Sequence, residues 1–118
     1  MTFNKVYIGD ELALSIRFGE DIIAQTFTVL NADDSAYSFV GQTSLNMFFY
    51  DRRGGKLLET ITEGATGVAI SSNVITWNSV WATDLSLMRD AGRYFYEMQH
   101  KDANGKIINT FFGPVKVK

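Results

Sequence analysis

Apolar side chains that recur at every second residue are the feature that most constrains the fold of this chain. The pattern is clear in three segments, residues 12–18, 45–49 and 94–98. A period of two places successive side chains on opposite faces of a β-strand, so each segment predicts a strand with one buried face. Polar turn clusters at residues 31–35 and 51–55 separate these segments. We therefore expect a chain built mostly of short strands.

The number and spacing of these strands predict the fold class. Seven to nine short strands, with turn signals about every 8–12 residues, predict an all-β, antiparallel, immunoglobulin-like β-sandwich, with a small barrel as the alternative. One segment breaks the period: Trp81, Leu85 and Met88 recur at steps of three and four residues. They predict one or two helical turns within residues 81–91, ended by Gly92, just before the strand that begins near residue 94.

Chain length and two glycine-containing dipeptides complete the expected architecture. The 118 residues predict a single domain over residues 1–118, because domains of about 60 residues bury too little surface for two independent cores. Asn104-Gly105 lies between two expected strands and predicts a hairpin with a type I′ turn, since both residues tolerate positive φ. Gly113-Pro114 predicts a bulge or an edge position, where the missing proline N–H does no harm.

Composition and charge narrow the classes of partner. The chain has 11 basic and 13 acidic residues, and its net charge of −2 offers no basic field for nucleic acid. Cysteine is absent, which suits folding in a reducing compartment. No apolar run approaches the roughly 18–20 residues needed to cross a bilayer, and residues 1–10 show no secretory signal pattern. We expect folding in the cytoplasm and no membrane partner.

No residue pattern predicts an enzyme, a cofactor or a metal site. His100 is the one histidine, near the end of an expected strand, and we expect an ordinary half-exposed side chain there. Zinc sites need several Cys or His ligands. Asp102 and Asn104 resemble part of a calcium loop but lack its remaining ligands, so the hairpin turn explains them better. No glycine pattern precedes a helix as in a nucleotide site.

One segment connects the chain to a known architecture. Residues 90–94, Asp-Ala-Gly-Arg-Tyr, fit the Asp-x-Gly-x-Tyr pattern at the start of strand F in immunoglobulin-like domains. Further turn and core segments follow in the same order as in that group, at residues 9–14, 39–41, 51–55, 102–106 and 112–117. The chain resembles the small immunoglobulin-like domains of tailed-phage structural proteins. In layout it is similar to the N-terminal domain of the phage baseplate upper protein family.

This resemblance implies both structural and functional expectations. Tyr94 would form a tyrosine corner, its hydroxyl returning to the upstream backbone, and Tyr96 would replace the second disulfide cysteine with an aromatic ring. The role implied is that of a non-enzymatic virion structural protein in a head, tail or baseplate. It would fold in the host bacterial cytoplasm and dock on other virion proteins, with a homo-oligomer as a further expectation.

A surplus of apolar side chains predicts where such docking occurs. If alternate residues of the strands equivalent to C, F and G face the core, four aromatic residues face outward on one sheet: Phe48, Tyr50, Phe95 and Phe112. Contiguous apolar surface of this kind usually marks a contact site. Two alternatives remain open. The expected helix or a loop covers this face, or a bulge shifts the register and exchanges the faces.

A carbohydrate-binding or receptor-binding module is the alternative function. In it, Trp77 and Trp81, together with Tyr37 and Tyr50, would present rings to a surface glycan. Against this, Trp77 alternates with Ile75 in an apolar strand and Trp81 anchors the expected helix. The burial tendency of large aromatic side chains therefore favours a place in the core for both tryptophans.

Overall fold

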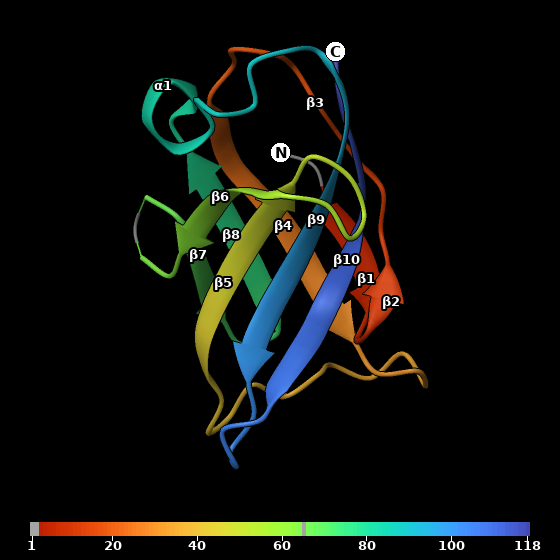
Figure 1. The fold of residues 1–118 in the computed structure, drawn as a ribbon. Helices are drawn as coiled ribbons and strands as arrows, with labels where there is room; N and C mark the ends of the chain where they lie inside the picture. Colours follow the sequence, from red (N-terminus) through yellow and green to blue (C-terminus); the bar gives the residue numbers. More distant parts are fainter. Residues whose placement is uncertain (1–2, 65) are drawn as a thin grey trace.

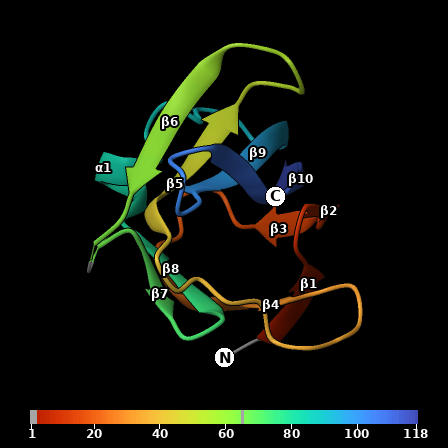
Figure 2. The same cartoon turned by 90° about the horizontal axis from the view of Figure 1, so that it is seen from below.

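Two β-sheets pack face to face in the computed structural model, which describes residues 3–64 and 66–118 (Figures 1 and 2). The first sheet contains four strands, in the order β1 (Phe3–Tyr7), β4 (Ile22–Leu30), β8 (Val74–Ser79) and β7 (Val68–Ser71). The second has the order β2 (Asp10–Glu11), β10 (Ile107–Val117), β9 (Gly92–Lys101), β5 (Thr43–Tyr50) and β6 (Leu57–Thr62), and β3 (Leu14–Ile16) also pairs with β10. The predicted all-β sandwich is confirmed.

The first three strands correct the expectation of an antiparallel sandwich with seven to nine strands. β1 runs parallel to β4, and both β2 and β3 run parallel to β10, so each sheet is mixed. The described residues form ten strands because this N-terminal segment is divided between the sheets. Gly9, with φ of 77°, turns the chain from the first sheet to the second. Alternation reports which face of a strand is buried but not the direction of its neighbour.

Alternate residues of both sheets meet in one core. The fully buried side chains include Phe27, Ile75 and Trp77 from the first sheet and Leu45, Met47, Phe49, Tyr96, Met98 and Phe111 from the second. Tyr96 lies at the centre, where its ring centroid is 6.1 Å from that of Phe111. Its hydroxyl donates a 2.7 Å hydrogen bond to the Leu12 carbonyl oxygen. This aromatic ring thus occupies the core position where the resemblance implied it.

The helix is present but shorter than predicted. α1 covers only Trp81–Asp84, and Gly92 opens β9 instead of ending a helix. The Leu87 N–H, which a longer helix would direct to a carbonyl one turn earlier, donates to the Glu59 carboxylate at 2.7 Å. Leu85 and Met88 are nevertheless buried, so their spacing correctly indicated inward side chains.

The hairpin at Asn104-Gly105 forms with a different turn from the one predicted. Gly105 has φ of 79°, whereas Asn104 is not in the left-handed region, so the turn is not type I′. The Asp102 carboxylate accepts the N–H groups of Asn104 and Lys106, both at 2.9 Å. These side-chain hydrogen bonds stabilise a turn in which only the glycine needs positive φ.

Of the two positions predicted for Gly113-Pro114, the structure shows the edge position and not the bulge. The register shift in β10 falls between Asn109 and Phe111, so no bulge forms at residues 113–114. β2 pairs with Phe111 and Phe112, and β3 pairs with residues 115–117. Pro114 therefore lies in the interval between the β2 and β3 pairings, where no strand residue is paired with it on that side and a missing N–H disturbs no ladder.

Candidate functional site

The three adjacent strands β5, β9 and β10 bring the four predicted aromatic residues onto one surface. Phe48 lies opposite Glu97 of β9, and Glu97 lies opposite Phe112 of β10. Tyr50 lies opposite Phe95 in the same register. Their sequence neighbours on each strand point into the core, so these side chains occupy the side of the second sheet turned away from the first. We call Phe48, Tyr50, Phe95 and Phe112 the aromatic face.

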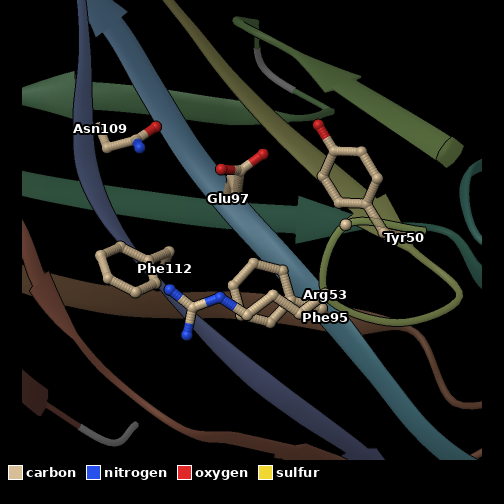
Figure 3. Close-up of a pocket in the computed structure, with 7 residues that line it drawn as sticks. Tyr50, Arg53, Phe95, Glu97, Asn109 and Phe112 are labelled. Carbon is tan, nitrogen blue, oxygen red and sulfur yellow. The ribbon is translucent and has the colours of Figure 1, made fainter. Parts of the chain in front are cut away.

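A loop of the chain itself partly covers the aromatic face. Phe48, Tyr50 and Phe112 are half-buried, but Phe95 is only 8% exposed. The guanidinium carbon of Arg53 lies 5.4 Å from the Phe95 ring centroid and 5.6 Å from that of Phe112. Figure 3 shows the Arg53 side chain crossing Phe95. The sequence left open whether the helix or a loop covers this face. The structure shows that the β5–β6 loop covers part of it, whereas no residue of α1 lines the surface beside Phe95 and Phe112.

The hairpin loop between β5 and β6 holds Arg53 over the sheet. Its ends are joined by a 3.0 Å hydrogen bond from the Asp51 N–H to the Lys56 carbonyl, and the Lys56 N–H donates to the Asp51 carboxylate at 2.8 Å. Gly54 has φ of 71° at the tip. At Gly55 a Cβ atom would collide with the Asp51 carboxylate. Both glycines are therefore needed for this tight turn.

Beside Arg53, the aromatic face contains a hollow of about 330 Å³, which we call the Glu97 hollow. Its lining combines rings with polar groups: Tyr50, Arg53, Gly54, Phe95, Glu97, Asn109 and Phe112. In Figure 3 the Glu97 carboxylate lies between Asn109 on one side and Tyr50 on the other. The hollow thus has a carboxylate at its centre and aromatic rings around it.

The electrostatics of the Glu97 hollow are set by that carboxylate. Burial, together with a hydrogen bond to Glu97, raises the pKa of the Tyr50 hydroxyl to about 12. Ion pairs among the described residues are Arg17–Glu20 and Arg52–Asp51, so no described cationic nitrogen lies within 4.0 Å of Glu97. The Glu97 carboxylate is therefore hydrogen-bonded by Tyr50 but forms no ion pair with any residue that the structure describes.

Tyr94 makes the type of contact that the resemblance implied. Its hydroxyl donates a 2.7 Å hydrogen bond to the carbonyl oxygen of Asp90, four residues upstream. This contact ties the start of β9 to the segment that leads into it. The role is structural, because Tyr94 does not line the Glu97 hollow.

The rings suggested for a glycan do not gather on the surface. Trp77 is 0% exposed, and its indole N–H donates to the Ser79 hydroxyl at 2.7 Å. Trp81 is 7% exposed, so both tryptophans belong to the core, as their sequence context favoured. Tyr37 and Tyr50 line two different hollows and cannot hold one sugar between them.

His100 is buried, and the expectation of a half-exposed side chain is wrong. It is 1% exposed, with its Nδ1 atom 2.6 Å from the Thr110 hydroxyl oxygen and its Nε2 atom 3.3 Å from that of Tyr37. Burial lowers the pKa of the imidazole, and the Asp102 charge acts in the opposite direction. A signal was present in the sequence: His100 follows Tyr96 and Met98 at a two-residue spacing, which points it inward.

The described residues offer no metal site and no membrane-spanning helix. Within residues 3–64 and 66–118, no group of three or more His, Cys, Asp or Glu side chains is placed to hold a metal ion. No helix among the described residues is long and apolar enough to span a membrane. The sequence matches no protein-family model and no curated protein. The aromatic face with its Glu97 hollow is therefore the candidate functional site.

Proposed function

We propose that this protein is a non-catalytic structural protein of a tailed-phage particle, which docks on other particle proteins through the aromatic face. One observation carries the docking part of this proposal. Three neighbouring strands place four aromatic side chains on the outward side of one sheet, and three of them are still half-exposed. Clustered aromatic side chains on a sheet surface are typical of protein contact sites.

The strand order supports an immunoglobulin-like class for this sandwich. The orders β1-β4-β8-β7 and β10-β9-β5-β6 correspond to the A-B-E-D and G-F-C-C′ orders of immunoglobulin domains. The hydrogen bond between Tyr94 and Asp90 is a second supporting feature. The parallel pairing of β1 with β4 is a departure from that architecture. The phage setting, and a place in the virion after folding in the host cytoplasm, are supported by the sequence resemblance alone.

Burial of the aromatic face supplies the docking energy in this proposal. Truncation of a central aromatic residue in a protein interface often costs about 2 kcal/mol or more. Phe48 and Phe112 offer the accessible ring surface, whereas Phe95 supports the Phe112 ring from the side, at a centroid distance of 6.1 Å. A second copy of the chain is one candidate partner, and another virion protein is the other.

Site-specific photo-crosslinking in producing cells tests this proposal. A benzophenone amino acid is placed at Phe48 or at Phe112, and the matched control is Ala69, which is exposed on β7 of the opposite sheet. We expect the protein to sediment with phage particles, and positions 48 and 112 to give adducts with a particle protein. Absence from the particles, or equal adducts from position 69, would contradict the proposal.

Glycan binding is the second candidate function, and it is supported by an observation that does not involve the tryptophans. The Glu97 hollow combines two accessible rings, Tyr50 and Phe112, with the polar groups of Glu97 and Asn109. Rings with a few polar groups are a common composition for small-ligand sites. If positions 48 and 112 crosslink to a cell-surface polysaccharide instead of to a protein, this candidate is favoured.

A further inference from the structure

We infer that the Glu97 hollow receives a cationic side chain, arginine or lysine, of the docking partner, and that Arg53 of the same chain occupies part of this site until the partner displaces it. This inference rests on the proposed docking function and names the chemistry of the partner. It follows from three properties of the hollow, which are its rings, its carboxylate and the way in which Arg53 is attached.

The rings of the hollow already hold a cation. The Arg53 guanidinium carbon is within 5.6 Å of the ring centroids of both Phe95 and Phe112. The π-electrons give each face of a phenyl ring a partial negative charge, which attracts cations at such distances. Because the contact is made by an arginine of the chain itself, the structure demonstrates that a guanidinium fits over these two rings.

The carboxylate of the hollow is left without a cationic partner by Arg53. Glu97 is half-buried between Phe48 and Phe112 on the neighbouring strands, and it has no described cation within 4.0 Å. An incoming arginine or lysine has access to both the rings and the Glu97 charge, whereas Arg53 uses the rings alone. The hollow is thus more complementary to a second cation than to the one that now covers it.

Arg53 is attached in a way that allows displacement without unfolding the loop. The hydrogen bonds that close the loop join Asp51 to Lys56 and leave out the Arg53 side chain. The adjacent Arg52 is paired with the Asp51 carboxylate at 3.6 Å, but Arg53 has no ion pair among the described residues. The Arg53 side chain is exposed at the loop tip. Only its contact with the rings has to be broken.

Titration of the ¹⁵N-labelled full chain with N-acetyl-arginine amide, followed by backbone amide shifts, tests the inference. Two neutral probes are compared, N-acetyl-citrulline amide, which has nearly the same shape, and a methyl glycoside. We expect the arginine probe to shift the amides of Glu97, Asn109 and Phe112, and both neutral probes to have much weaker effects.

Three variants then separate the parts of the site. Glu97→Gln should weaken binding of the arginine probe about three- to tenfold, because it removes the charge that pairs with the ligand. Arg53→Gln should tighten binding about two- to fivefold, since the competing cation is lost from the rings. Arg52→Gln is the matched control, and it should leave the affinity unchanged because Arg52 pairs with Asp51.

Each contrary result overturns the inference. If the citrulline probe binds as tightly as the arginine probe, the hollow does not recognise the positive charge. If the arginine probe binds more weakly to Arg53→Gln than to the wild type, Arg53 contacts the ligand instead of competing with it. Binding of the glycoside in place of the arginine probe would favour the glycan candidate. If crosslinks form at positions 48 and 112 but the arginine probe does not bind, docking stands and only the cation site fails. If the probe binds but no crosslinks form, the hollow is a cation site, but docking through the aromatic face fails and with it the assignment of the cation to a partner.

Discussion

A single buried histidine places an ionisable group within the sandwich. His100 contacts the Thr110 hydroxyl through Nδ1 and the Tyr37 hydroxyl through Nε2, and the Phe39 ring packs against it at a centroid distance of 5.1 Å. These contacts join the segment that precedes β5 to the β9–β10 hairpin. Protonation of the imidazole would place a charge in this buried position, and the Asp102 charge offsets that cost only in part.

This placement predicts a stability that depends on pH. Because burial lowers the folded-state pKa of His100 below its ordinary 6.5, the unfolded chain binds the proton more readily. The contribution of neutral His100 to the free energy of unfolding is therefore fully present above a pH of about 7. It is lost as the pH falls through 6.5 toward the folded-state pKa. Urea unfolding of the wild type should show a decreasing free energy of unfolding from pH 7.5 to 5.5.

The variant His100→Gln provides the control for that measurement. Glutamine does not titrate, so its free energy of unfolding should change less over the same pH range, whatever its absolute value. A difference in slope between the two proteins therefore reports the histidine and its interaction with the Asp102 charge. The same slope in both proteins would show that another group is responsible.

At the scale of elements, β10 depends on a close approach that only glycine allows. Gly113 is buried, and a Cβ atom there would collide with the carbonyl oxygen of Leu12. The same oxygen accepts the Tyr96 hydroxyl, and the Leu12 N–H donates to the Phe112 carbonyl at 2.7 Å. The segment between β2 and β3 is thereby held against β10.

We expect Gly113→Ala to lower the free energy of unfolding by about 1–3 kcal/mol, because the Leu12 backbone must move and weaken these hydrogen bonds. Equilibrium unfolding in urea measures the change. Lys116→Ala, exposed on the same strand, should alter stability by no more than about 0.5 kcal/mol. A Gly113→Ala protein as stable as the wild type would indicate that the Leu12 segment adapts without cost.

The candidate site also shows which elements local sequence can predict. Alternation in β5, β9 and β10 correctly placed Phe48, Tyr50, Phe95 and Phe112 on one side of the sheet, since the side-chain period of a strand is local. Turn residues at 51–55 predicted the loop after β5, but not that Arg53 would lie over Phe95 and Phe112. That contact depends on the direction in which the loop leaves the sheet, and on two strands distant in sequence.

At the scale of the whole molecule, both sheets contribute to one apolar core. Trp77 of β8 packs on Phe49 of β5 with ring centroids 5.6 Å apart, and Phe27 of β4 packs on Phe111 of β10 at 5.0 Å. Each pair crosses from one sheet to the other. Loss of either sheet would therefore expose the core face of its partner.

This arrangement predicts cooperative unfolding as one domain. Tryptophan fluorescence, which reports on the buried Trp77 and Trp81, should give the same urea midpoint as far-UV circular dichroism, which reports on the strands. Refolding from urea should retrace the same curve. Two separate midpoints would show that the sheets, or the N-terminal strands, unfold independently, and would contradict the single-domain expectation for residues 1–118.

The sequence by itself determined which side chains of each strand face the core, where the chain turns, and that strands dominate, because periodicity and turn chemistry act over a few residues. Only the tertiary structure decided the parallel pairing of β1, β2 and β3 and the early end of α1 at Asp84. It also decided that Arg53 covers part of the aromatic face while Glu97 has no ion pair among the described residues. Each of these depends on segments far apart in the chain, whose contacts no local pattern encodes.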